Sequence, residues 1–331
     1  MIAGYLASQE GVSVSLLTTQ PGRWSGEISV TDPEGRIFKG KIDRVSSEAE
    51  EVIPQADIVL LCLPGYAIGP ELRKIAAHLG GGTWVGTAVS STGFFFAAHE
   101  ILSQTQPLFG FQRVPFISRI VEYGKTAELK GYKSSLRVVV ERAEDRETVR
   151  ATLERLFGVG VELLDSYYEV SLSNSNPLLH TSRLYSMLRE WKPGVEYVEN
   201  PQFYEGWTDE ASELLIAMDE EFQGLLRAIG LRAGSIPPIL EYYESVDARS
   251  LTNKIRSIVA FQNIASPMIK TEGGKYVPDF NSRYFTEDFL YGMRFIVESA
   301  AKYNVMIPTI SRVYAWGSEQ VSKYTTFRIE K

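Results

Sequence analysis

Apolar and polar positions alternate in their spacing along the first half of the chain, as they do when strands and helices follow one another. Short apolar runs bounded by turn residues predict buried strands, and apolar positions three or four apart predict helices. The clearest strand is 56–63, which ends at Pro64-Gly65. Further strands are predicted at 12–18, 83–89, 108–111, 135–140 and 160–164, a hairpin at 28–38, and helices at 70–79, 92–102 and 146–157. This order predicts a Rossmann-like α/β domain with a mostly parallel sheet covered on both faces.

The second half has a different pattern, in which the helical spacing continues with few strand signals. Over residues 209–229, seven apolar residues recur at helical spacing and predict a packed face: Leu214, Leu215, Met218, Phe222, Leu225, Leu226 and Ile229. Other helices are predicted at 177–191, 237–244, 251–264, 286–303 and 311–323. We therefore expect an incomplete dinucleotide-binding domain at 1–168 and an almost all-α substrate domain at 169–331.

Composition limits the classes of partner. The chain has 331 residues, 44% of them hydrophobic, which is enough for two cores. Its formal net charge of -7, without dense basic runs, argues against nucleic acid as a partner. No stretch approaches the ~18 consecutive apolar residues of a membrane span, and the N-terminus lacks a cationic leader, so we expect a cytoplasmic protein. A single cysteine, Cys62, lies in the apolar run and is expected to be a buried small hydrophobe. A homodimer is compatible with the sequence.

The strand run that ends at Leu63 and Pro64 is typical of a strand whose carboxyl end passes under a dinucleotide. We expect Leu63, Pro64 and Tyr66 to lie beside that cofactor. The glycine-rich fingerprint that usually binds the pyrophosphate is absent. Residues 2–17 resemble what normally follows that fingerprint, so we expect the chain to begin downstream of it and to bind NAD(P)H weakly.

Cofactor choice is usually determined at the end of the next strand, where an acidic residue holds the ribose hydroxyls of NAD. This chain carries Thr18 and Arg23 in that region and no acid. A hydroxyl and a guanidinium suit a 2′-phosphate, so we expect NADP rather than NAD.

The chemistry of the second half centres on one histidine. His78 and His99 lie on predicted helices with no polar constellation nearby and are expected to be structural or surface residues. His180 instead follows Asn176-Pro177 at the start of a helix, where proline is favoured. A second polar segment, Arg283-Tyr284-Phe285-Thr286-Glu287-Asp288, precedes another predicted helix, which Thr286 is expected to cap.

These segments, together with the strand run ending in Leu63-Pro64, resemble the opine (octopine/nopaline) dehydrogenase family. The resemblance implies a Rossmann domain followed by an α-helical domain. It also implies an enzyme that condenses an amino acid with an α-keto acid and reduces the imine with NAD(P)H. By this resemblance His180 is the catalytic histidine, Asp288 its carboxylate partner, and Arg283 a substrate-contacting arginine. Asn176 is expected to contact the substrate as well.

The chemistry agrees with those roles. A histidine titrates near neutral pH and can donate the proton that the reduction requires. A guanidinium can bind the carboxylate of the substrate in a bidentate manner. Gln112, between two predicted strands, could face the same substrate.

Two alternatives remain open. One is a dehydrogenase of the ketopantoate or 3-hydroxyacid type, for which Lys254 is the candidate catalytic lysine. The other is a non-catalytic remnant that serves as a binding module.

Overall fold

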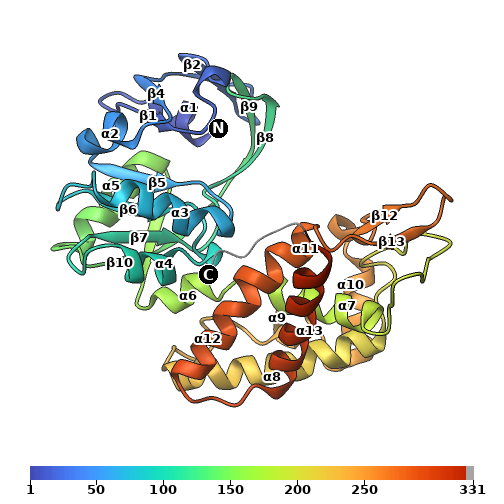
Figure 1. Ribbon diagram of the computed structural model, residues 1–331. Helices are drawn as coiled ribbons and strands as arrows, with labels where there is room; N and C mark the ends of the chain where they lie inside the picture. Colours follow the sequence, from blue (N-terminus) through green and yellow to red (C-terminus); the bar gives the residue numbers. More distant parts are fainter. Residues whose placement is uncertain (326–331) are drawn as a thin grey trace. The chain divides into compact units, whose positions relative to one another are not determined.

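The computed structural model describes residues 1–325, and they divide into two compact units, Met1–Ser171 and Leu172 onward (Figure 1). The division falls three residues after the boundary expected from the sequence. The first unit contains three sheets and the second is mainly helical. The predicted fold class, a Rossmann-like domain followed by a helical domain, is therefore confirmed.

The main sheet of the first unit has five strands in the order β11-β10-β7-β6-β5. Neighbouring strands run parallel except for β7 and β10. The strands are β5 (Ile58–Leu61), β6 (Trp84–Thr87), β7 (Leu108–Phe111), β10 (Ser135–Glu141) and β11 (Gly160–Leu164). The helices that connect or flank them are α3 (Gly65–Ala76), η3 (Ser90–Thr92), α4 (Phe94–Ile101), α5 (Arg146–Phe157) and α6 (Tyr167–Ser171).

Helices cover both faces of this sheet because successive side chains of a strand point to opposite sides. On β10, Val138 and Val140 belong to the hydrophobic cluster that includes α5, whereas Val139 belongs to the cluster that includes α3 and α4. All three valines are buried. The two clusters form the cores on the two faces of the sheet, as the apolar runs predict.

The remaining strands of the first unit form two smaller sheets. The strands β1 (Ser15–Leu17) and β4 (Arg44–Ser46) pair in parallel. A four-stranded sheet has the order β3-β2-β9-β8. Its strands are β2 (Glu27–Thr31), β3 (Ile37–Lys41), β8 (Phe116–Glu122) and β9 (Thr126–Tyr132), and the short helices nearby are α1 (Ile2–Ala7), η1 (Pro21–Arg23), α2 (Ala49–Val52) and η2 (Ile53–Gln55).

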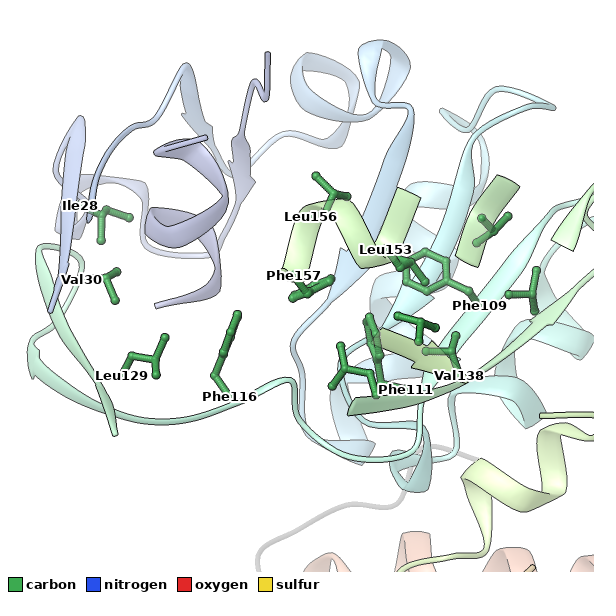
Figure 2. Packing of buried hydrophobic residues seen from close by; sticks show 14 of the residues in the cluster. Ile28, Val30, Phe109, Phe111, Phe116, Leu129, Val138, Leu153, Leu156 and Phe157 are labelled. Carbon is green, nitrogen blue, oxygen red and sulfur yellow. The ribbon is translucent and has the colours of Figure 1, made fainter. Parts of the chain in front are cut away.

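The four-stranded sheet shares a core with the main sheet (Figure 2). Phe116 of β8 lies with its ring centroid 5.8 Å from that of Phe157 in α5. Leu129 and Val30 contribute from β9 and β2. The β2–β3 hairpin was predicted, but β8 and β9 were not. Along β8, apolar and polar side chains do not alternate, and Ile120 and Val121 are both exposed.

The second unit consists mainly of packed helices (Figure 1). They are α7 (Asn176–Leu188), α8 (Asp209–Ile229), α9 (Ile239–Tyr242), α10 (Ala248–Ser257), η4 (Val259–Phe261), α11 (Arg283–Thr286), α12 (Arg294–Lys302) and α13 (Pro308–Tyr324). A π-helical turn, η5 (Asp288–Met293), lies between α11 and α12. One short antiparallel pair, β12 (Met268–Lys270) and β13 (Tyr276–Pro278), interrupts the helices.

Several local expectations are wrong. The helix predicted over 286–303 is divided by the π-helical turn, and Thr286 does not cap it: Thr286 lies within α11 and its hydroxyl donates to the carbonyl of Ser282. The helix α3 begins at Gly65 rather than at Pro70, because Pro64 already takes the N-cap position. Cys62 is exposed at the end of β5 rather than buried. The apolar run predicts the strand, but the strand ends at Leu61, one residue before Cys62.

Candidate active site

The helix α7 presents His180 from its first turns. Asn176 and Pro177 begin the helix, and a proline there needs no amide hydrogen for the helical pattern. His180 is buried, with only 8% of its surface exposed. A buried imidazole requires partners for its ring nitrogens, since an unpaired polar group inside a protein is costly.

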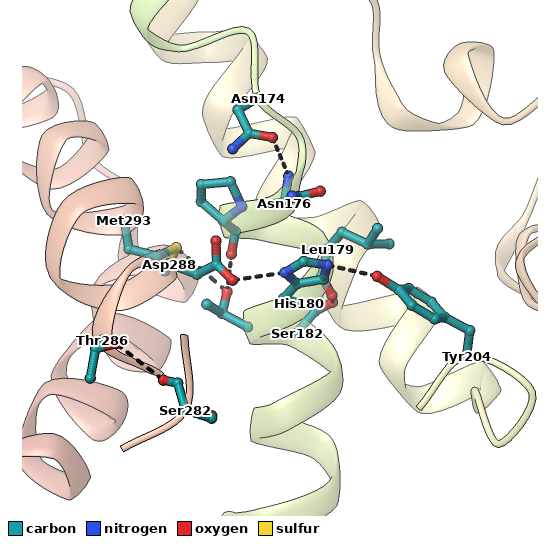
Figure 3. Close-up of polar contacts among 12 residues, drawn as sticks. Asn174, Asn176, Leu179, His180, Ser182, Tyr204, Ser282, Thr286, Asp288 and Met293 are labelled. Carbon is teal, nitrogen blue, oxygen red and sulfur yellow. Dashed lines mark hydrogen bonds and ion pairs between the residues drawn. The ribbon is translucent and has the colours of Figure 1, made fainter. Parts of the chain in front are cut away.

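Both ring nitrogens of His180 have such partners (Figure 3). Nδ1 lies 2.7 Å from Oδ2 of Asp288. Nε2 lies 2.7 Å from the hydroxyl of Tyr204. With a carboxylate on Nδ1, that nitrogen must carry a proton, which fixes the tautomer of the neutral ring and leaves Nε2 to exchange the second proton. The arrangement can therefore hold and release one proton through Nε2.

Asp288 reaches the histidine from the π-helical turn η5. In this turn the amide of Gly292 donates to the carbonyl of Glu287, five residues earlier. The backbone of the turn approaches α7 closely: a Cβ on Gly292 would lie 2.4 Å from Cγ of Pro177. Glycine at this position thus allows the turn that carries Asp288 to lie against the first turn of α7, and π-helical turns are frequent at functional sites.

Aromatic rings enclose the imidazole. Its centroid lies 4.7 Å from the ring of Tyr284 and 5.7 Å from that of Phe203. Tyr204 stacks on Phe261 at 4.1 Å. These rings exclude water from the histidine and its partners, which strengthens the electrostatic interactions among them.

Tyr204 and Tyr284, the two tyrosines of the site, both have a raised pKa. Burial raises the pKa of Tyr204, and the neighbouring Tyr284 adds to the increase. Burial and the charge of Asp288 raise the pKa of Tyr284. Both phenols therefore stay protonated at neutral pH.

The segment that carries Tyr204 is attached to the same helix as His180. Arg183, one turn beyond His180, is buried, and its Nε donates to the carbonyl of Phe203 at 3.1 Å. Burial and the nearby charge of Arg256 lower the pKa of Arg183 to about 10. The guanidinium is still a cation at neutral pH, and it fixes the backbone next to Tyr204.

Of the other residues predicted to contact the substrate, two are exposed in the second unit and one lies in the first unit. Arg283, at the start of α11, is exposed, and its chain neighbour Tyr284 contacts His180. Asn176 is exposed at the start of α7, and its backbone N–H donates to the side-chain oxygen of Asn174. Gln112 belongs to the first unit, where its side chain donates to the carbonyl of Glu169 at 3.3 Å.

The predicted cofactor residues follow the strands of the first unit. Thr18 comes directly after β1, and its amide donates to the carbonyl of Ser46. The guanidinium of Arg23 lies 4.2 Å over the ring of Tyr123 and donates to Gln20 at 2.9 Å. Leu63 and Pro64 link β5 to α3, and Tyr66 is exposed in the first turn of that helix.

His99 and Lys254 both form polar contacts with glutamates. His99 does have a polar partner, since its Nε2 lies 2.6 Å from a carboxylate oxygen of Glu141. Glu141 ends β10, 42 residues further along the chain, so the local sequence around His99 does not indicate this partner. Lys254, the candidate of the alternative mechanism, forms an ion pair with Glu244.

Tyr204 was not predicted, because nothing in its local sequence marks it. Tyr284 lies within the segment that suggested Arg283 and Asp288, and only its position in that segment could have indicated it.

Comparison with known proteins shows which family the chain resembles. Residues 163–321 match the family model described as the α-helical domain of NAD/NADP octopine/nopaline dehydrogenases. The opine dehydrogenase of Haliotis discus hannai is 25% identical over 97% of this chain and 87% of its own. The octopine dehydrogenase of Mizuhopecten yessoensis is 26% identical, with the same shares covered. A solved octopine dehydrogenase structure with NADH and L-arginine superposes with a TM-score of 0.85, at 26% identity over 97% of this chain and 86% of that one.

The chain is similar to opine dehydrogenases in sequence and in fold. The resemblance inferred from its motifs is thereby confirmed, and with it the enzyme class, an NAD(P)-dependent dehydrogenase. Within residues 1–325, none of the helices combines the length and the apolar character that crossing a bilayer requires. The same residues contain no group of three or more acidic, histidine or cysteine side chains that could hold a metal ion.

Proposed function

We propose that this opine dehydrogenase relative joins the amino group of an amino acid to the keto carbon of an α-keto acid and reduces the resulting imine to a secondary amine. The observation that carries the proposal is the buried contact of His180 with Asp288, 2.7 Å long. A paired histidine can give and take a proton at neutral pH, and this reaction needs such a group.

Proton accounting shows why one acid is needed. The amino acid enters as an ammonium ion and the product is also a cationic amine, while the keto oxygen leaves as water. Hydride addition therefore leaves the reaction one proton short, and that proton must come from the protein. In the proposal His180 supplies it as an imidazolium, which the negative charge of Asp288 stabilises.

The substrate carboxylates require a cation. We propose Arg283 for this role, because it is exposed and lies next to Tyr284, whose ring contacts His180. A planar guanidinium binds a carboxylate through two parallel hydrogen bonds. Asn176 and Gln112 remain proposals as further substrate contacts.

The nicotinamide cofactor supplies the hydride. The strand ends fit such a group in one respect: β5 and β6 pair in parallel with Leu61 opposite Thr87, so both end at the same edge of the sheet. We propose that Leu63, Pro64 and Tyr66 lie along the cofactor and that Thr18 and Arg23 bind the ribose end. Because Arg23 is a surface cation where NAD enzymes usually carry an acid, we propose NADPH as the preferred donor.

The proposal is tested by oxidation of NADPH in the presence of pyruvate and an amino acid such as L-arginine. We expect oxidation that requires both the keto acid and the amine and that is slower with NADH. The product should be a secondary amine, identified by mass spectrometry. Oxidation with the keto acid alone would instead favour the ketopantoate or 3-hydroxyacid type of enzyme. No oxidation with any pair of substrates would favour the binding module.

Replacement of Arg283 tests the carboxylate site. In Arg283→Ala we expect KM for the keto acid to rise by about tenfold or more, with a smaller change in kcat, because a contact made equally in the ground and transition states affects mainly KM. Arg294→Ala is a matched control, since Arg294 is paired with Glu298 on α12. An unchanged KM in Arg283→Ala would exclude the proposed role.

A further inference from the structure

A cavity of about 280 Å³ lies between the helix α8 and the segment that enters α9. The residues that line it are different from those of the His180 site. They include the charged residues Asp219, Glu220 and Arg227 and the apolar residues Ile216, Pro238 and Leu240. The volume is just below the range of roughly 300–1,000 Å³ that is usual for drug-sized ligands, so the cavity suits a smaller molecule.

Asp219 is a carboxylate buried without a cation. Only 7% of its surface is exposed. Its Oδ2 accepts the backbone N–H of Ile239 at 2.8 Å, and its Oδ1 accepts the side-chain amide of Gln223 at 3.3 Å. Within residues 1–325 it forms no ion pair, and burial raises its pKa. Because a buried charge is costly unless it is paired, this side of the cavity favours a ligand with a positive charge.

The opposite charge lies at the other end of the lining. Arg227 follows Asp219 by about two helical turns, is exposed, and likewise has no ion pair in the described part of the chain. Its guanidinium leans back along α8, since Nη2 lies 3.8 Å from the position of a Cβ on Gly224. Five residues separate Gly224 from Asp219, which is roughly 7.5 Å along a helix axis.

A free amino acid carries both complementary charges at a matching distance. Its ammonium nitrogen and its carboxylate carbon are about 2.5 Å apart, as the two bonds that join them require. A hydrogen bond of about 2.9 Å at each end extends this span to roughly 8 Å. One zwitterion can therefore reach the carboxylate of Asp219 and the guanidinium of Arg227 together.

We propose that this cavity binds a free α-amino acid with an apolar side chain, its ammonium group on Asp219 and its carboxylate on Arg227. Ile216, Pro238 and Leu240 supply the apolar surface against which the side chain packs. The site is separate from the substrate site proposed around Arg283, and it does not depend on the reaction proposed there.

Two neighbouring side chains favour this orientation of the ligand. Gln223 also lines the cavity, and because its NH2 group is bound to Asp219, its side-chain oxygen can accept a second hydrogen bond from the ammonium. Glu220 is exposed next to Asp219 in the chain, and its charge repels a carboxylate from this end. A metal ion fits less well, because residues 1–325 contain no group of three or more acidic, histidine or cysteine side chains that could hold one.

Calorimetric titration with three probes tests the two charges of the ligand separately. The probes are L-leucine, isopentylamine, which lacks the carboxylate, and 4-methylpentanoate, which lacks the ammonium group. We expect L-leucine to bind and each of the other two to bind about tenfold or more weakly, because each loses a charge-assisted hydrogen bond. Neither cofactor nor keto acid is present, so the titration does not require turnover.

Two variants assign the ends of the ligand. Asp219→Asn keeps the size of the side chain and an oxygen for the N–H of Ile239, and Arg227→Gln changes an exposed residue, so both should fold. In Asp219→Asn the affinity for both L-leucine and isopentylamine should fall about tenfold, whereas in Arg227→Gln only that for L-leucine should fall. Glu213→Gln is the matched control, since Glu213 is an exposed carboxylate of α8 outside the lining, and its affinities should equal those of the wild type.

Three results would overturn the site. One is L-leucine affinity that stays unchanged in both Asp219→Asn and Arg227→Gln. Another is no binding of L-leucine at millimolar concentration. The third is binding lost in Arg283→Ala but kept in Asp219→Asn, which would place the amino acid at the proposed catalytic site. Failure of the proposed reaction would instead appear as absent turnover, with these titrations unaffected.

Discussion

His180→Ala should remove most of the turnover, with kcat lowered about 10²- to 10⁴-fold, the usual contribution of a general acid or base. The physical reason is that the buried ring is the only group joined to both the carboxylate of Asp288 and the hydroxyl of Tyr204 in the described part of the chain. Alanine retains neither nitrogen, so no proton can pass between them. Steady-state rates of NADPH oxidation, with the keto acid and amino acid both saturating, would measure the loss.

The companion variant Asp288→Asn should retain part of that activity. Asparagine keeps the size of the side chain but not its charge, so the imidazolium loses its stabilisation. His99→Ala serves as the control, because His99 is also paired with a carboxylate but lies in the first unit. If His180→Ala and His99→Ala are equally active, the histidine is not the proton donor.

The sequence predicted the main sheet well because its central strands, such as β7, are apolar and buried on both faces. The strand at Gly160–Leu164 and the helices at Arg146–Phe157 and Asp209–Ile229 were placed to the residue. Continuous apolar runs and long amphipathic patterns are the strongest signals available in a single sequence. The edge strand β8 lacks such a signal, since several of its apolar side chains are exposed.

The site could be predicted only in part. His180 and Asp288 are 108 positions apart, and no periodicity connects them. The family motifs suggested the pair, and the fold then brought the two side chains into contact. Tyr204 could not be predicted, because it lies in an irregular segment that contacts His180 only once the segment has packed against α7. The π-helical turn could not be predicted either. The sequence pattern over 286–303 predicts one continuous helix and does not indicate hydrogen bonds between residues i and i+5.

The close approach of Gly292 to Pro177 suggests a second variant with a large effect, since it separates packing from chemistry. In Gly292→Ala the new Cβ would lie 2.4 Å from Cγ of Pro177, well inside van der Waals contact. The turn η5 and the first turn of α7 would have to move apart, which carries Asp288 away from His180. Overpacking of this kind typically costs about 1–3 kcal/mol.

We therefore expect Gly292→Ala to melt several degrees lower, at roughly 2–4 °C per kcal/mol for a domain of this size. Turnover should fall by up to about 10²-fold, the effect of a displacement near 1 Å at a catalytic group. Gly224→Ala is the matched control, because Gly224 is also helical and a Cβ there would find its nearest neighbour at 3.8 Å, the flexible end of Arg227. That control should be unchanged or more stable by about 0.5–1 kcal/mol, since alanine favours a helix over glycine. Equal melting temperatures and rates for the two variants would show that the contact of η5 with α7 does not position Asp288.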